Sequence, residues 1–104
     1  MEHPLTKAEG EALIRKIASL PAGVSFRDHC LNRMKQRTID ALDFTRVLRN
    51  AVMVSQPYVR NGEWRYRIQE RPGNSPPERR DIEIVVVIES DTQLQGHTVY
   101  RRRR

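Results

Sequence analysis

The dipeptide Asn61-Gly62 stands between two runs of alternating apolar and polar residues, 52–59 and 63–70. Alternation with a period of two is typical of a β-strand that has one dry face and one wet face. Asn-Gly between such runs is the strongest short signal for a hairpin, because both residues readily adopt the positive φ of a tight turn. The sequence therefore predicts a β-hairpin in which residue 60 faces 63, residue 59 faces 64, residue 58 faces 65, and residue 56 faces 67.

The two faces of this hairpin are predicted to differ in polarity. The dry face holds the apolar members of the second strand: Trp64, Tyr66 and Ile68. The wet face carries Arg65 and Arg67, with Tyr58 opposite Arg65, and we expect both arginines to be exposed and unpaired on the side away from the helices. Pro57 cannot donate a hydrogen bond to a ladder, so the first strand is expected to lie at an edge or to break there.

The first half of the chain has the period of a helix instead. The Thr-x-x-Glu pattern of residues 6–9 is a capping box and predicts a first helix over 6–20, which the sequence Leu-Pro-Ala-Gly ends. Ser25 is a good cap for a second helix over 26–37, and Asp40 is a good cap for a third. Three helices are therefore expected before the strands.

After the hairpin come a polar loop and two more predicted strands. Residues 71–80 hold three prolines and predict a solvent-facing loop. Residues 81–90 form the most apolar strand, with aliphatic side chains on both faces, and residues 94–100 form the last strand. This order indicates an α+β fold, with the N-terminal helices packed on one face of an antiparallel sheet of about four strands, arranged as a meander.

The length of 104 residues fits a single domain, 1–104. The first helix, 6–20, is a candidate appendage to that domain, and residues 101–104 are a basic tail. The formal net charge is +6, and the tail supplies four of the positive charges. A basic chain favours an anionic partner, either a nucleic acid or an acidic protein.

The composition indicates a cytoplasmic protein. Cys30 is the single cysteine, so no disulfide can form within the chain, which suits a reducing compartment. The longest aliphatic run, residues 84–88, is far too short to span a membrane, and the first residues lack the pattern of a secretory signal. We therefore expect a cytoplasmic location without a membrane partner.

Three side chains of the second predicted helix, His29, Arg33 and Arg37, lie four residues apart and share one stripe. A cationic stripe beside a titratable imidazole suits a phosphodiester. The same stripe can instead hold the helix to the sheet, through hydrogen bonds from the arginines to strand carbonyls or carboxylates. The carboxylates considered for this contact are Glu70, Glu83 and Glu89. The sequence leaves both interpretations open.

The segment 29–44, HCLNRMKQRTIDALDF, resembles the signature of bacterial domain-of-unknown-function family 4258. That signature is a His, an Arg-Met pair, an Arg-Gly-Ile triplet and an acidic helix start. The matching residues are His29, Arg33-Met34, Arg37-Thr38-Ile39 and Asp43, followed later by Tyr66-Arg67, Ile84 to Ile88 and Thr98-Val99-Tyr100. The resemblance covers residues 25–101, leaves the first helix outside, and has Thr38 where the family has glycine.

This family in turn resembles, more distantly, the small ribonuclease toxins of the RelE and BrnT type. The resemblance implies a compact α+β fold with helices on one side of an antiparallel sheet. It also implies RNA cleavage and an antitoxin partner. No residue role is carried over from those toxins, because the chain has no matching catalytic motif.

Metal-free RNA cleavage requires a base for the 2′-hydroxyl proton, cations for the phosphorane and an acid for the leaving oxygen. His29 and His97 can carry a proton near neutral pH, and the arginine fork matches two phosphate oxygens. The candidate catalytic residues are His29, Arg33, Arg67 and Tyr100. The candidate RNA-binding residues are Arg37, Tyr58, Arg65, Arg101 and Arg102. The His and Cys residues lack metal-ligand spacing, so neither a metal site nor a cofactor is predicted.

Two functions are compatible with these residues. The first is a small basic RNA-binding protein, in its catalytic form a metal-independent endoribonuclease toxin, with RNA or the ribosome as target and an acidic antitoxin-like protein as partner. The alternative is a non-catalytic protein–protein interaction module that binds an acidic partner. The His29 stripe and the row of Arg65 and Arg67 are expected to form separate patches, joined only around a sheet edge. The oligomeric state stays open.

Overall fold

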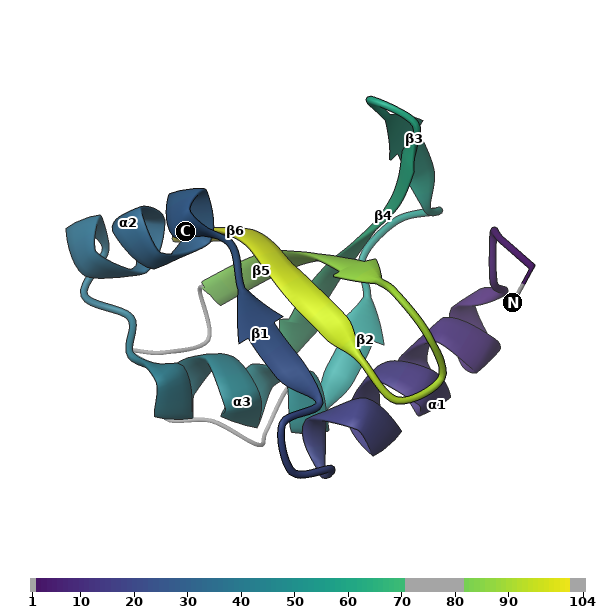
Figure 1. Cartoon of the computed structure of the whole chain (residues 1–104), viewed down its shortest axis with the longest axis horizontal. Coiled ribbons are helices and arrows are strands. Elements are labelled where there is room, and N and C mark those ends of the chain that lie inside the picture. The colour runs from purple at the N-terminus through teal and green to yellow at the C-terminus, as the bar shows by residue number, and fades with distance from the viewer. Residues whose placement is uncertain (1, 71–81, 102–104) are drawn as a thin grey trace.

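The computed structural model describes residues 2–70 and 82–101, over which the chain forms three helices and a mixed sheet of six strands (Figure 1). The helices are α1 (Lys7–Ala18), α2 (Asp28–Gln36) and α3 (Ala41–Arg49). The strands are β1 (Val24–Phe26), β2 (Ala51–Met53), β3 (Tyr58–Arg60), β4 (Glu63–Glu70), β5 (Ile82–Ile88) and β6 (Leu94–Arg101). The predicted α+β class is confirmed. No helix of the described part is long and apolar enough to cross a membrane.

The sheet differs from the predicted four-stranded antiparallel meander. Its order is β1-β6-β5-β4-β2, and β3 also pairs with β4. The strands β4, β5 and β6 are antiparallel as expected, but β1 pairs with β6 in parallel, with Val24 beside Leu94. The sequence does not reveal β1, because three residues are too few for alternation to be recognised and because Ser25 has the chemistry of a helix cap.

The hairpin register is correct next to the turn and wrong beyond it. The three predicted pairs nearest the turn are present, and Asn61 and Gly62 both have positive φ. Further along, Met53 faces Ile68, so residues 54–57 oppose only two residues of β4, and residue 56 does not face residue 67. The break contains Pro57, as expected of a residue that has no amide hydrogen, and it divides the one predicted strand into β2 and β3.

The helices α1 and α3 lie together along one side of the sheet, and the β3–β4 hairpin projects from the other side (Figure 1). The sheet face that α1 and α3 cover is called the inner face below. Its fully buried residues include Tyr66, Ile68, Ile84 and Val86. Ile14 and Ile17 of α1, the helix considered as an appendage, are buried in the same hydrophobic cluster.

Helix α2 packs against β6, and a glycine allows the close approach. A Cβ atom at Gly96 would lie 2.6 Å from Cζ of Phe44 and 3.1 Å from Sγ of Cys30. Both distances are too short for ordinary contacts, so a larger residue would push α2 and α3 away from β6. Gly96 therefore helps to place the side chains of α2 beside the last strand.

Helix α2 ends in a left-handed residue. Thr38 has a φ of 56°, and the amide of Ile39 donates to the carbonyl of Met34 at 2.9 Å. These are the features of a Schellman ending, in which the left-handed residue is usually glycine. Thr38 adopts this conformation although its side chain is β-branched, which stores strain at the end of α2.

The predicted loop at residues 71–80 and residues 102–104 of the basic tail lie outside the described residues. Residue Arg101, the first of that tail, belongs to β6.

Candidate functional site

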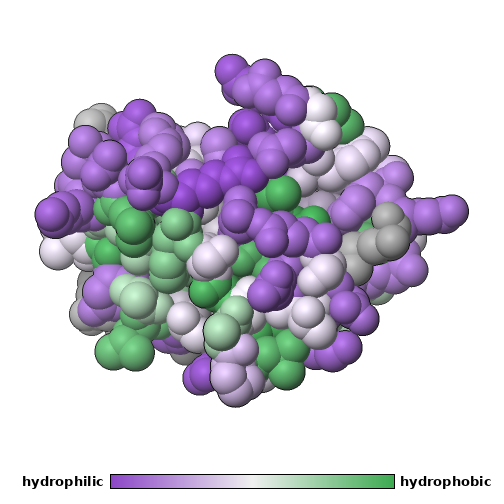
Figure 2. Space-filling model, in the orientation of Figure 1, coloured by the Kyte–Doolittle hydropathy of each residue, from purple (hydrophilic) through white to green (hydrophobic). Residues whose placement is uncertain are grey.

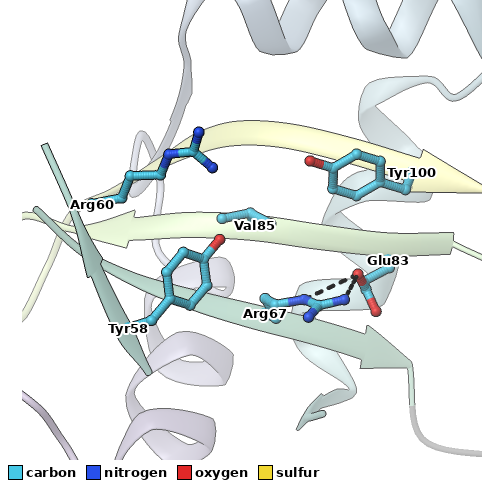
Figure 3. Close-up of a pocket in the computed structure, with 6 residues that line it drawn as sticks. All are labelled: Tyr58, Arg60, Arg67, Glu83, Val85 and Tyr100. Atoms are coloured by element: carbon cyan, nitrogen blue, oxygen red, sulfur yellow. Dashed lines mark hydrogen bonds and ion pairs between the residues drawn. The ribbon is translucent and has the colours of Figure 1, made fainter. Parts of the chain in front are cut away.

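The sheet face turned away from α1 and α3, called the outer face, carries an open depression of about 470 Å³. Six residues line it: Tyr58, Arg60, Arg67, Glu83, Val85 and Tyr100 (Figure 3). Val85 forms an apolar middle, and the hydroxyl groups of Tyr58 and Tyr100 point toward it from opposite sides (Figure 3). Aromatic, cationic and apolar surfaces therefore meet in one concavity.

Strand pairing brings these side chains together. Arg67 of β4 faces Val85 of β5, and Glu83 of β5 faces Tyr100 of β6. Because side chains alternate along a strand, these four point to the outer face, whereas Tyr66 points into the core. Strand β3 supplies the remaining two residues from across the hairpin.

Arg67 is held in place by a buried carboxylate. Its Nη2 and Nε atoms lie 2.7 and 3.2 Å from Oε2 of Glu83, and Nε2 of Gln69 lies 3.4 Å from Oε1. The Glu83 side chain is 4% exposed, whereas the Arg67 side chain is 43% exposed. Hydrogen bonding to Glu83 and its negative charge raise the pKa of Arg67. The guanidinium is therefore fixed yet reachable by an anion, although it is not unpaired as the sequence suggested.

Arg65, which was expected to be exposed on the same face, is buried. It is 7% exposed, its Nη2 lies 3.8 Å from Oε1 of Glu63, and its Nε has no hydrogen-bond partner among the described residues. Arg27 and His97 lie against this end of the face, with Arg27 Nη1 3.3 Å from His97 Nδ1. The expected exposure is wrong, because residues distant in the sequence cover Arg65.

The stripe of His29, Arg33 and Arg37 runs beside β6. The ring of His29 lies 5.9 Å from the ring of His97, and Cζ of Arg37 lies 6.0 Å from the centre of the Tyr100 ring. Tyr100 also lines the depression. The two patches that were expected to be separate therefore meet at β6.

Two of the three carboxylates considered as partners for this stripe, Glu70 and Glu83, have other partners. Glu70 pairs with Arg46 of α3, and Glu83 pairs with Arg67, at 2.7 Å in each case. Arg33 hydrogen bonds to Gln36 within α2 at 3.4 Å. The stripe therefore does not hold α2 through the carboxylates of Glu70 and Glu83.

Arg101 connects the last strand to the end of α2. Its Nε donates to the carbonyl of Arg37 at 2.8 Å, and its Nη2 donates to the carbonyl of Thr38 at 3.2 Å. This predicted RNA-binding residue thus has a structural contact that holds α2 against β6. Arg102, the neighbouring candidate, lies outside the described residues.

The structure brings only some of the predicted residues together. Three of them line the depression: Tyr58, Arg67 and Tyr100. Arg37 reaches its edge through Tyr100, whereas His29 and Arg33 do not line it. Sequence reasoning missed Arg60 and Glu83. Both had a signal, since Arg60 lies on the same side of its strand as Tyr58, and Glu83 is a charge within an aliphatic strand that needs a partner.

The surface around the hairpin is hydrophilic. Figure 2 shows this surface gathered around the β3–β4 hairpin, and apolar surface gathered lower in the view, on the side of α1 and α3. Leu42 of α3 is the most exposed large apolar residue in the described part of the chain, at 81%. The most hydrophilic surface in this view therefore lies at the hairpin end of the molecule, and the apolar surface lies toward α1 and α3.

The described residues offer little for metal or thiolate chemistry. Within residues 2–70 and 82–101, no group of three His, Cys, Asp or Glu side chains is placed to hold a metal ion. Burial raises the pKa of Cys30 to about 11, so the thiol stays protonated at neutral pH. The polar groups that line the depression are its arginines, its tyrosines and the carboxylate of Glu83.

The fold and the site define a small α+β protein with an arginine- and tyrosine-lined depression on the open face of its sheet. Comparison with protein-family models, with curated proteins and with solved structures finds no match to this chain. The resemblance to the domain-of-unknown-function family and to the ribonuclease toxins stays a prediction, and the function has to follow from the geometry of the site.

Proposed function

We propose that this protein binds single-stranded RNA in the depression on the outer face. The observation that carries the proposal is the convergence of Tyr58, Tyr100, Arg60 and Arg67 around Val85. Aromatic rings stack on unpaired bases, and guanidinium groups bind phosphate oxygens. A duplex fits less well, because its bases are already stacked on each other.

The charges of the site also favour a polyanion. Arg60 is exposed, Arg67 keeps an exposed side, and Arg37 lies next to Tyr100. Glu83 is the carboxylate among the lining residues, and Arg67 already pairs with it. Three guanidinium groups around one carboxylate leave the site with positive potential.

Cleavage of the bound RNA, as in a metal-independent endoribonuclease toxin, is the further activity we propose for the same site. Arg60 and Arg67 would stabilise the phosphorane. Both oxygens of Glu83 already accept hydrogen bonds, from Arg67 and Gln69, so Glu83 would have to exchange a partner to act as a base. Binding is therefore the primary proposal, and cleavage is second.

Fluorescence anisotropy with a short labelled single-stranded RNA at low salt tests the binding. Tyr58→Leu keeps apolar volume and removes the stacking ring, and we expect it to weaken binding by about 1–3 kcal/mol. Arg60→Gln is expected to reduce the slope of log affinity against log salt by about 0.7. The matched control is Arg49→Gln, which removes an exposed charge at the end of α3 and is expected to change neither value.

Absence of salt-sensitive RNA binding, or an equal loss in Arg49→Gln, would contradict the proposal. The same mixtures on a denaturing gel, with EDTA present, test cleavage. Fragments formed by the wild-type protein but not by Arg67→Gln support a ribonuclease. Intact RNA at a large excess of protein removes the enzyme and leaves binding alone.

Docking of an acidic protein is a second candidate function, favoured by an aromatic ring exposed beside the arginines. Tyr100, which lines the depression, is 42% exposed, and Val59 is 52% exposed on the opposite side of β3 from Arg60. Protein interfaces combine such groups with arginine. Competition with poly-glutamate tests this second function. Displacement of bound RNA by poly-glutamate at an equal concentration of negative charge supports an acidic protein partner such as an antitoxin. Absence of displacement contradicts this second function.

A further inference from the structure

We propose that Arg27, Arg65 and His97 form a binding site for a phosphate group, and that the carboxylate of Glu63 occupies this site in the unliganded protein. These four residues are called the Glu63 cluster. None of the four residues lines the depression. It gathers residues from β4, from β6 and from the position directly before α2.

Glu63 binds Arg27 in the way that a phosphate would. The Nη1 and Nη2 atoms of Arg27 lie 2.9 and 2.5 Å from the two carboxylate oxygens of Glu63. The Nε atom of Arg27 lies 2.7 Å from Oε1 of Gln95, which fixes the orientation of the guanidinium. A planar guanidinium that receives two oxygens side by side fits a phosphate as well as a carboxylate.

Arg65 is the group that Glu63 leaves unsatisfied. Its side chain is 8% exposed, Nη2 lies 3.8 Å from Oε1 of Glu63, and the buried Nε has no hydrogen-bond partner in the described part of the chain. A buried charged group with an unpaired donor is costly, so it points to a missing ligand. Both oxygens of the carboxylate are engaged by Arg27, whereas a phosphate has further oxygens for Arg65.

A β-bulge directs His97 toward the cluster. Val85 pairs with Thr98, and Val86 pairs with Gly96, so His97 has no partner in the ladder. Bulges are common beside functional sites, where the extra residue changes the direction of a side chain. The imidazole can therefore reach Arg27, and Nδ1 and Nη1 lie 3.3 Å apart.

The cluster holds more positive than negative charge. The charged or titratable groups that face His97 are Arg65, Arg27, His29 and Glu63. Burial, followed by the charges of Arg65 and Arg27, lowers the pKa of His97. Helix α2 begins directly after Arg27, so the positive end of its dipole lies here as well. Glu89 also lies near enough to Arg27 for its charge to act on that guanidinium. A tetrahedral phosphate group can direct oxygens to both Arg27 and Arg65, which the planar carboxylate of Glu63 does not do.

Glu63 can leave the cluster by rotation of its side chain. The side chain is 34% exposed and directly follows the Asn61-Gly62 turn at the tip of the hairpin. The side chain of Arg27 is 29% exposed, so the position left by Glu63 opens to solvent. Glu63 is therefore expected to compete with phosphate inside the same molecule.

The neighbouring depression suggests the natural source of the phosphate, and this part of the inference rests on the proposed function. Arg65 lies opposite Tyr58, and Glu63 lies opposite Arg60, so the cluster adjoins two lining residues of the depression. A nucleotide stacked on Tyr58 would place a backbone phosphodiester within reach of the cluster. The ligand of the Glu63 cluster is thus inferred to be a phosphodiester of RNA.

Titration with inorganic phosphate, followed by NMR of the arginine Nε–H and histidine ring signals, tests the phosphate site. Glu63→Gln is expected to bind phosphate about five- to tenfold more tightly than the wild-type protein, with shifts at Arg65 and His97, because the competing carboxylate is gone. The matched control is Glu9→Gln, which makes the same charge change in the capping box of α1 and is expected to match the wild type.

Unchanged Arg65 and His97 signals in Glu63→Gln, or an equal gain in Glu9→Gln, would overturn the phosphate site. Tighter RNA binding by Glu63→Gln than by Glu9→Gln supports a phosphodiester as the ligand. Equal RNA affinity of the two variants, with phosphate still bound by Glu63→Gln, overturns the assignment to RNA and keeps a site for free phosphate. If the protein binds phosphate at the Glu63 cluster but binds no RNA, the proposed function is wrong and the phosphate site stands.

Discussion

The two faces of β5 are both buried, but different kinds of neighbour bury them. On the inner face, Ile84 and Val86 belong to the hydrophobic cluster under the helices. On the outer face, Glu83 and Val85 are 3% and 2% exposed, yet charged and aromatic side chains surround them. An aliphatic strand therefore predicts that both faces are buried, but it does not predict which face becomes core and which becomes the floor of a site.

The buried carboxylates of the two faces are also paired with arginines in different ways. Arg46, on the α3 side, pairs with Asp43 and Glu70, whose side chains are 6% and 2% exposed. On the outer face, Arg67 pairs with Glu83 but keeps much of its own surface in solvent. The ion pairs of Arg46 are suited to holding α3 on the sheet. The ion pair of Arg67 leaves a cation available to a ligand.

Removal of each arginine gives the largest expected contrast. Arg46→Met should lower the free energy of unfolding by about 3 kcal/mol, because the buried carboxylates of Asp43 and Glu70 both lose the guanidinium that pairs with them. Arg67→Met should cost roughly 1 kcal/mol, since water reaches its exposed position and Gln69 still donates to Glu83. Urea unfolding of both variants measures the difference, and equal losses would show that the two ion pairs are buried alike.

Val86→Ala and Val85→Ala make the same change on opposite faces of one strand. Val86→Ala should lower the free energy of unfolding by about 2–3 kcal/mol, because the closed core is left with a void. Val85→Ala should cost about 1 kcal/mol, because solvent in the open depression can fill the space. Chemical denaturation of the pair gives the comparison, and a larger cost at Val85 would contradict it.

The pH dependence of stability is the smallest expected effect, and it reports on the outer face. The pKa of His97 is lowered in the folded protein, chiefly by burial and then by the charges of Arg65 and Arg27. The unfolded chain therefore takes up the proton first as the pH falls. The contribution of His97 to stability is complete above the ordinary histidine pKa and is lost as the pH falls through the lowered folded value.

We expect the free energy of unfolding of the wild-type protein, in a buffer without phosphate, to decline as the pH falls below the ordinary histidine pKa of about 6.5. His97→Gln should flatten this decline in the free energy of unfolding. Arg65→Gln should raise the midpoint of the NMR titration of His97, because one positive charge near the ring is removed. The midpoint should stay below the ordinary histidine value, because the ring is still buried. If Arg65→Gln leaves the titration midpoint of His97 unchanged, the two side chains do not interact electrostatically.

The local signals at Thr6 and Asp40 gave correct predictions because each depends on a few adjacent residues. Thr6 caps α1 in the predicted capping box, and Asp40 caps α3. Ser25 was predicted to cap the second helix and does not, because it lies in β1 and α2 begins after Arg27. The Asn61-Gly62 turn likewise determines the three pairs next to it. These elements need no knowledge of the rest of the chain.

The outer face was predicted only in part, because it depends on contacts between distant segments. The parallel pairing of β1 with β6 and the bulge at His97 bring Arg27 and His97 against Arg65, about 30 to 70 positions apart in sequence. No local pattern encodes such contacts. The burial of Arg65 and the meeting of the α2 stripe with Tyr100 were therefore missed, whereas Tyr58 and Arg67 were placed on the right face.

The ladder break at residues 54–57 has a consequence for the width of the depression. Strand β3, which carries Tyr58 and Arg60, is hydrogen bonded to β4 and not to β2. Its distance from Tyr100 therefore depends on how far a single strand, β4, bends and twists beyond Arg67. We therefore expect bending of β4 beyond Arg67 to widen or narrow the depression while the helices beneath stay in place.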